Sequence, residues 1–142
     1  MLIRPIEILL VEDNSADARL VIEVFKDFKI NNEIYHAKDG VEAIDFLYKN
    51  GKYNNMPKPD IILLDLNLPK KDGREVLKEI KKDHELKSIP VVILTTSNSE
   101  EDVKKTYSDH ANCYITKPVD FEPFVNVLKS IEKFWLNMVK LP

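Results

Sequence analysis

The chain has 142 residues, of which 44% are apolar and 32% charged, and its net charge at pH 7 is −3. This length and composition predict one globular domain with a real buried core, and they argue against intrinsic disorder and against a disulfide scaffold. We expect a single domain over residues 1–142, with no DNA-binding or catalytic output module attached.

Several features bear on where such a protein acts. The single cysteine, Cys113, cannot form an internal disulfide, and the N-terminus lacks the basic-then-apolar pattern of a secretory signal. No apolar run approaches the roughly 20 residues that a membrane span requires. Basic residues are scattered along the chain and form no stripe of the kind that binds nucleic acid. The sequence therefore predicts a cytoplasmic protein that binds neither membrane nor nucleic acid.

Short apolar runs alternate along the chain with amphipathic patterns of helical period. The runs that predict strands are residues 6–11, 33–37, 61–64, 91–94 and 114–116. The patterns that predict helices are residues 16–28, 41–47, 73–82, about 99–110 and about 121–139. The polar stretch 49–58 predicts a loop, and Ser99 with Asp102 predicts a capping box at the start of the fourth helix.

Five strands that alternate with five helices predict an α/β fold. The first, third and fourth strands lack polar alternation, as strands buried on both faces do. At this length the best candidate is the flavodoxin-like, doubly wound, five-stranded parallel sheet in the order 2-1-3-4-5, with helices on both faces.

Polar residues follow the strands at the same end each time. The first strand leads into Glu12 and Asp13, the third into Asp65, the fourth into Thr95 and the fifth into Lys117. The carboxyl ends of parallel strands share one edge, with a crevice where the strand order reverses. We therefore expect Glu12, Asp13 and Asp65 to face one another between the first and third strands.

This arrangement suits phosphoryl transfer. Clustered carboxylates are hard to keep ionised without a cation, and an all-oxygen site open to water suits Mg²⁺. A lysine and a threonine hydroxyl at the same edge can offset the charge on phosphoryl oxygens. Asp65, at the end of the most central strand, is the candidate nucleophile, with Glu12 and Asp13 as metal ligands and the Asn67 backbone carbonyl as a further one.

Each residue alone has a simpler interpretation. Asp13 or either of the two residues after it could cap the first helix, Thr95 could simply end a strand, and Lys117 could lie on the surface. Asp65 is harder to explain in this way, because a carboxylate directly after four buried aliphatic residues is costly unless its site uses it. The coincidence of these residues at one sheet edge favours a functional site.

Together these residues resemble the CheY-like receiver domains of two-component response regulators, in which a histidine kinase passes a phosphoryl group to an aspartate. The motifs that carry the resemblance are Glu12-Asp13, residues 65–73 (DLNLPKKDG), Thr95 after the fourth strand, and Lys117-Pro118. They span nearly the whole chain in the family's order.

The resemblance implies roles for individual residues. Asp65 would be the phospho-acceptor, and Mg²⁺ would be bound by the set Glu12, Asp13, Asp65 and the carbonyl of Asn67. Thr95 and Lys117 would contact the phosphoryl oxygens, and Thr95 would be coupled to Tyr114 in a conformational switch. The Lys117–Pro118 peptide bond is a candidate for the cis form.

A narrower resemblance is to the stand-alone regulators that partner phytochrome-type histidine kinases, and it is carried by loops and by the extended C-terminus. It implies a sensor kinase of that type as partner. In the tail, about residues 134–142, Phe134 and Leu141 fall off the buried stripe of the last helix. They either belong to a slightly longer core helix or form an apolar patch that buries in a homodimer, together with the fourth helix and fifth strand.

Two other function classes compete with a phosphorylated receiver. A phosphohydrolase of the haloacid-dehalogenase type needs a second aspartate two residues after its nucleophile, where this chain has Asn67. A flavin carrier would favour a hydroxyl-rich loop after the first strand, where Glu12 and Asp13 place negative charge instead. A receiver that signals without phosphate would not need the intact acidic site. We therefore expect a signalling receiver, not an enzyme, whose own chemistry is limited to its phosphorylation and dephosphorylation and whose output is an interaction with a protein partner or a second copy.

Overall fold

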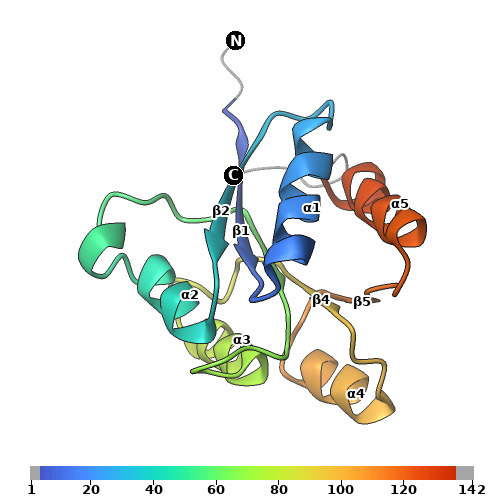
Figure 1. Ribbon diagram of the computed structural model, residues 1–142. Coiled ribbons are helices and arrows are strands. Elements are labelled where there is room, and N and C mark those ends of the chain that lie inside the picture. Colours follow the sequence, from blue (N-terminus) through green and yellow to red (C-terminus); the bar gives the residue numbers. More distant parts are fainter. Residues whose placement is uncertain (1–3, 137–142) are drawn as a thin grey trace.

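The computed structural model describes residues 4–136, which form a central parallel sheet with helices on both faces (Figure 1). The strands are β1 (Ile6–Val11), β2 (Asn32–Ala37), β3 (Ile61–Leu64), β4 (Val91–Thr95) and β5 (Cys113–Thr116). The helices are α1 (Ser15–Lys26), α2 (Gly40–Leu47), α3 (Gly73–Lys82), α4 (Glu100–Ser108) and α5 (Phe121–Ile131). A short 3-10 turn, Gly51–Tyr53, lies in the predicted loop, and a π-helical turn, Glu132–Leu136, follows α5.

The strand order is β2-β1-β3-β4-β5, and every neighbouring pair is parallel, as the sequence predicts. The register places Val11 beside Leu64 and Leu64 beside Ile93. The central strands therefore end nearly level with one another, and the residues that follow them meet at one edge of the sheet.

The core consists of two apolar layers, one on each face of the sheet. Alternate side chains of a strand point to opposite faces, so Leu9 and Val11 pack with α2 and α3, whereas Ile8 and Leu10 pack with α1 and α5. Figure 1 shows these helix pairs on opposite sides of the sheet. Burial on both faces explains why the central strands carry uninterrupted aliphatic runs.

Side-chain caps set where the helices begin. The side chain of Asn14 accepts a hydrogen bond from the Asp17 N–H at 2.9 Å, so Asn14 is the N-cap of α1 and Asp13 is left for another role. Ser99 caps α4 by accepting from the Asp102 N–H at 2.9 Å, which confirms one half of the predicted capping box. The chain leaves α4 through His110, whose φ of 70° is left-handed and ends the helix slightly earlier than predicted.

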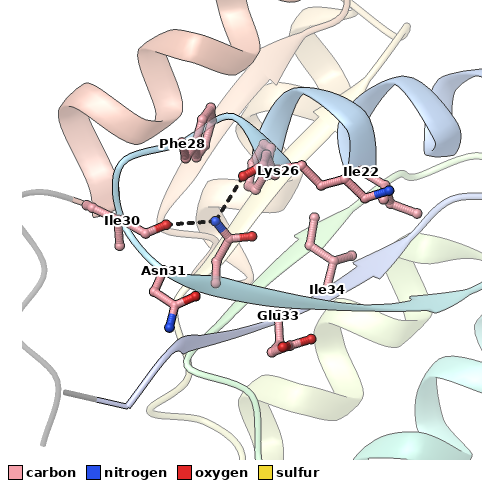
Figure 2. A pocket seen from close by; sticks show the side chains of 9 residues that line it. Ile22, Lys26, Phe28, Ile30, Asn31, Glu33 and Ile34 are labelled. Atoms are coloured by element: carbon pink, nitrogen blue, oxygen red, sulfur yellow. Dashed lines mark hydrogen bonds between the residues drawn. The ribbon is translucent and has the colours of Figure 1, made fainter. Parts of the chain in front are cut away.

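A cavity of about 300 Å³ lies between the end of α1 and the start of β2 (Figure 2). The side-chain amide of Asn32 donates to the carbonyls of Phe25 and Ile30, at 3.0 and 2.9 Å, and closes this turn. Asn32 pairs with Ile6, the first residue of β1. The cavity therefore lies at the amino-terminal edge of the sheet, opposite the edge where the polar residues gather.

The last helix agrees with the prediction as far as it is described. It is α-helical to Ile131 and continues through the π-helical turn, in which Phe134 is exposed. The rest of the predicted tail, including Leu141, lies outside the described residues, so the apolar dimer patch stays a prediction. Between residues 4 and 136, none of the helices has the length and apolar character needed to cross a membrane.

Candidate functional site

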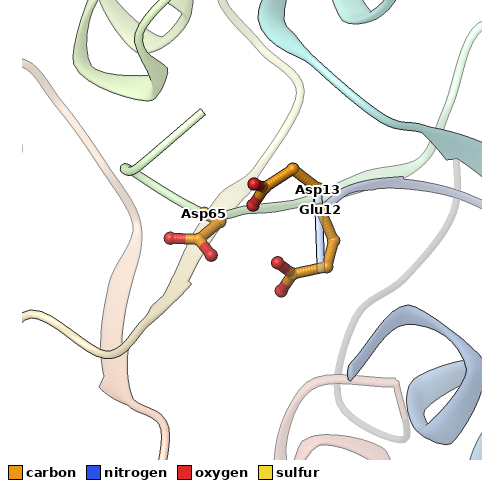
Figure 3. A group of neighbouring side chains, drawn as sticks. All are labelled: Glu12, Asp13 and Asp65. Carbon is orange, nitrogen blue, oxygen red and sulfur yellow. The ribbon is translucent and has the colours of Figure 1, made fainter. Parts of the chain in front are cut away.

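Three carboxylates gather at the carboxyl ends of β1 and β3. Glu12 and Asp13 directly follow β1, and Asp65 directly follows β3. Each offers an oxygen, and these oxygens all lie within 4.8 Å of one another (Figure 3). Glu12 and Asp65 are buried, at 2% and 6% exposure, whereas Asp13 is exposed and opens the group to water. The predicted acidic group is thus present where the strand order reverses.

The buried ammonium of Lys117 lies against this group. Its Nζ donates hydrogen bonds to Glu12, to Oδ2 of Asp65 at 3.1 Å and to Oδ2 of Asp17 at 3.0 Å. The backbone N–H of Lys117 donates to the carbonyl of Thr95, which ties the start of the β5–α5 connection to β4. Burial by itself lowers the pKa of Lys117, but its carboxylate partners outweigh burial and raise that pKa above the usual range. The lysine therefore stays charged.

Asp65 is held as an ionised carboxylate. Its Oδ1 accepts hydrogen bonds from the Thr95 hydroxyl at 2.7 Å and from the Asn67 N–H at 3.2 Å, while its Oδ2 accepts from Lys117. Burial favours the protonated form, but the Thr95 hydroxyl and the Lys117 charge prevail, and the pKa of Asp65 is lowered. An ionised aspartate with positioned donors on both oxygens is chemically suited to act as a nucleophile.

The ionised form of Glu12 is disfavoured by its surroundings. Burial raises the pKa of Glu12 to about 7; the negative charge of Asp65 adds to the rise, and Lys117 opposes it. Its Oε2 accepts a hydrogen bond from the Asn14 N–H at 3.2 Å. A divalent cation among these oxygens would relieve the repulsion between the carboxylates. The donor set is all carboxylate oxygen with one water-exposed member, which fits a hard cation such as Mg²⁺ or Mn²⁺.

The two predicted switch residues are linked through the β4–α4 loop. Thr95 ends β4 and is fully buried. Tyr114 of β5 is half-buried, and its hydroxyl donates to the carbonyl of Ser97, two residues after Thr95, at 2.8 Å. A displacement of the loop near Thr95 would therefore break or shift the hydrogen bond that holds the Tyr114 side chain.

The Lys117–Pro118 bond, named above as a candidate for the cis form, is trans. No peptide bond among residues 4–136 is cis. The trans form of an X–Pro bond is favoured by about 0.5–1 kcal/mol. From this trans backbone Lys117 already reaches its carboxylate partners, so the contacts of the site do not require the rarer isomer.

Sequence reasoning missed the contacts of four residues near the site. Arg74 of α3 donates two hydrogen bonds to the Asp102 carboxylate of α4, both at 2.7 Å, and Ser97 donates a third at 2.6 Å. Asp102 was expected to serve its own helix, so its position in the sequence did not reveal this pairing. The contact between Asp17 and Lys117 could not be recognised from the sequence either, because acidic residues are common in the first turn of any helix.

The chain matches the model of the response regulator receiver domain over residues 8–129. It belongs to this family. Its fold is CheY-like, as predicted, with the strand order 2-1-3-4-5. The acidic group and the threonine and lysine at the strand ends lie within the part of the chain that matches this family.

Relatives of this receiver are similar along nearly their whole length. It is 54% identical to response regulator Rcp1 of Synechocystis sp., over 97% of this chain and 94% of that protein. It is 42% identical to the probable methanogenesis regulatory protein FilR2 of Methanothrix harundinacea, over 97% of this chain and 88% of that protein.

Two solved structures are close to this receiver in shape. The Mn²⁺-bound form of Rcp1 has a TM-score of 0.94 at 54% identity and covers 97% of this chain and 99% of that one. The phosphorylated cyanobacterial phytochrome response regulator RcpA has a TM-score of 0.94 at 50% identity and covers 98% and 99%. These similarities confirm the resemblance to phytochrome-associated regulators that the sequence indicated.

Proposed function

We propose that this receiver accepts a phosphoryl group on Asp65 from a sensor histidine kinase and signals to a protein partner through a change in shape. The observation that carries the proposal is the Asp65 carboxylate itself. It is buried and ionised, is bound by Thr95 on one oxygen and Lys117 on the other, and lies within the acidic group. The phosphorylated relative RcpA and its phytochrome association support a kinase of the phytochrome type.

In the proposed reaction an oxygen of Asp65 attacks the phosphorus of a phosphohistidine. The new O–P bond forms as the N–P bond breaks, and the imidazole nitrogen leaves with the electron pair. Lys117 and the Thr95 hydroxyl, already within hydrogen-bond distance of Asp65, are placed to donate to the phosphoryl oxygens as charge shifts onto them. In dephosphorylation a water molecule attacks the phosphorus, the O–P bond to Asp65 breaks, and inorganic phosphate and the free Asp65 carboxylate are released.

Mg²⁺ would be held by the carboxylates of Glu12, Asp13 and Asp65 and by the backbone carbonyl of Asn67. When bound, it would offset the negative charge of the phosphoryl oxygens. The Mn²⁺-bound form of Rcp1 supports a divalent ion at such a site. Because the acceptor is the receiver's own side chain, we propose that it does not act as an enzyme on a separate substrate.

The output follows from the contacts of the β4–α4 loop. Phosphorylation converts the singly charged carboxylate of Asp65 into an acyl phosphate that carries close to two negative charges, so the site gains about one negative charge, placed farther out on the phosphoryl oxygens. We propose that the Thr95 hydroxyl then bonds a phosphoryl oxygen, that the loop shifts, and that Tyr114 and α4 change position with it. A partner protein, or a second copy of the chain, would bind the altered surface of α4, β5 and α5.

Phosphorylation with a small donor tests the function directly. Incubation with acetyl phosphate and Mg²⁺ is expected to give an acid-stable, base-labile phosphoryl adduct by intact mass, and chelation of the metal should abolish it. Asp65→Asn should give no adduct. Asp27→Asn, at an exposed aspartate that ends α1, is the matched control and should behave as the wild type.

Three outcomes would contradict the proposal: no adduct on the wild type, an equal adduct on Asp65→Asn, or rapid turnover of many phosphate esters. The last would favour the hydrolase alternative.

A further inference from the structure

Asp17 reaches across the fold to the site lysine. It lies in the first turn of α1, and its Oδ2 accepts a hydrogen bond from Lys117, 100 residues later in the chain, at 3.0 Å. An acidic residue at this point of a helix usually serves that helix, by binding the backbone N–H of the N-cap residue. Here the N–H of the N-cap residue Asn14 is bound by Glu12 instead. The Asp17 carboxylate is therefore directed to the lysine.

The three partners of Lys117 are not equivalent. An ammonium has three N–H donors, and those of Lys117 are directed to Glu12, Asp17 and Asp65. Glu12 and Asp65 belong to the acidic group that fits a cation, and Asp65 is also the phosphoryl acceptor. Asp17 is not a member of that group. It is the partner that can keep holding the ammonium while the other two take up their roles in the reaction.

The backbone that carries Asp17 is firmly anchored. Its N–H donates to the Asn14 side chain at 2.9 Å, which fixes the first turn of α1. The next residue, Ala18, is buried, and α1 continues through buried Val21 against α5. The carboxylate thus extends from a rigid base, and 27% of the Asp17 side chain is still exposed to solvent.

We propose that Asp17 is a positioning residue that holds the Lys117 ammonium beside Asp65 during phosphoryl transfer. This inference rests on the proposed function. A lysine ammonium sits on a flexible four-carbon stem, and a displacement of a reacting or donor group by about 1 Å can cost about 100-fold in rate. By restraining the stem, Asp17 acts on the reaction through Lys117 without touching the phosphoryl group.

The test compares phosphorylation rates over a range of acetyl phosphate concentrations with Mg²⁺ present. Asp17→Asn is expected to lower the maximum rate about tenfold or more, with little change in the half-saturating donor concentration. Asp17→Glu, which restores the charge, should recover part of the loss. Glu23→Gln removes the same charge from an exposed position of α1 and should react as the wild type.

A double-mutant cycle with Lys117→Ala shows whether Asp17→Asn changes the phosphorylation rate through Lys117 or independently of it. If Asp17 acts through Lys117, adding Asp17→Asn to Lys117→Ala changes the rate no further. In NMR spectra, the ammonium protons of Lys117 should exchange with water faster in Asp17→Asn than in the wild type. Thermal melts confirm that each variant is folded, and Asp17→Ser replaces Asp17→Asn if the latter is not.

The inference is overturned by a wild-type rate in Asp17→Asn, by an equal loss in Glu23→Gln, or by additive losses in the cycle. Any of these, with an Asp65-dependent adduct on the wild type, leaves the proposed function intact. Absence of that adduct would instead defeat the proposed function.

Discussion

At the scale of single residues, the charge states in the site are set by two opposing effects, burial and pairing with oppositely charged or hydrogen-bonding groups. Burial acts against the charge of Glu12, Asp65 and Lys117 alike, yet the three stabilise one another because opposite charges and hydrogen-bond donors meet in one place. Thr95 matters in this balance because a neutral hydroxyl donor at 2.7 Å favours the ionised form of Asp65 without adding charge.

Thr95→Val tests this contribution, since valine keeps the shape of threonine and removes the hydroxyl. The pKa of Asp65 is expected to rise in the absence of metal, and the carboxyl ¹³C chemical shift of Asp65, followed against pH, measures it. Thr95→Ser retains a hydroxyl and should leave that pKa near the wild-type value. An unchanged pKa in Thr95→Val would contradict the assigned role.

At the scale of elements, the Arg74–Asp102 ion pair links α3 to α4 beside the β4–α4 loop. The paired hydrogen bonds from Arg74, with the one from Ser97, lower the pKa of Asp102 to about 2. Because the folded-state pKa lies below the unfolded value of about 3.9, Asp102 stabilises the fold above about pH 4. This stabilisation is lost as the pH falls toward the folded-state pKa.

Asp102→Asn is therefore expected to lower the free energy of unfolding at pH 7 by up to about 1 kcal/mol, since the pair is partly exposed and solvent screens it. The difference from the wild type should shrink as the pH falls from 5 toward 3 in urea unfolding. Glu101→Gln, an exposed acidic neighbour in the same first turn of α4, controls for the helix dipole. A pH-independent difference would show that the ion pair is not its cause.

At the scale of the whole molecule, cation binding and folding are linked through the acidic group. The carboxylates of Glu12, Asp13 and Asp65 converge only when β1 and β3 are paired, so a cation bound to all of them favours the folded state. Packing on both faces of the sheet provides the rigidity that holds these strand ends together.

Mg²⁺ is accordingly expected to raise the melting temperature of the wild type in a concentration-dependent way. In Asp13→Asn the rise should be much smaller, while the metal-free melting temperature stays the same or increases, because one like charge is removed from the cluster. Scanning calorimetry with and without Mg²⁺ measures both effects. An equal Mg²⁺-dependent rise in Asp13→Asn would place the cation elsewhere.

The sequence by itself determined the alternation of strands and helices, the strand order and the five site positions Glu12, Asp13, Asp65, Thr95 and Lys117. The alternation follows from local periodicity, and the strand order was predicted as the best candidate for a five-stranded α/β domain of this length. The site positions follow from the rule that parallel strands present their carboxyl ends at a common edge. Burial on both faces made strand β3, Ile61–Leu64, recognisable as an aliphatic run, and the helical spacing of Val76, Leu77 and Ile80 identified helix α3, Gly73–Lys82. Both elements were predicted with their observed bounds.

Only the tertiary structure decided which groups pair. It assigned the α1 cap to Asn14, turned Asp17 toward Lys117 and Asp102 toward Arg74, and left the Lys117–Pro118 bond trans. It also showed that a side chain at Gly73 would overlap the backbone of Asp65 and Leu66, so this turn packs directly against the residues at the end of β3. Such pairings join residues far apart in the chain and depend on the distances that packing imposes, which no local pattern encodes.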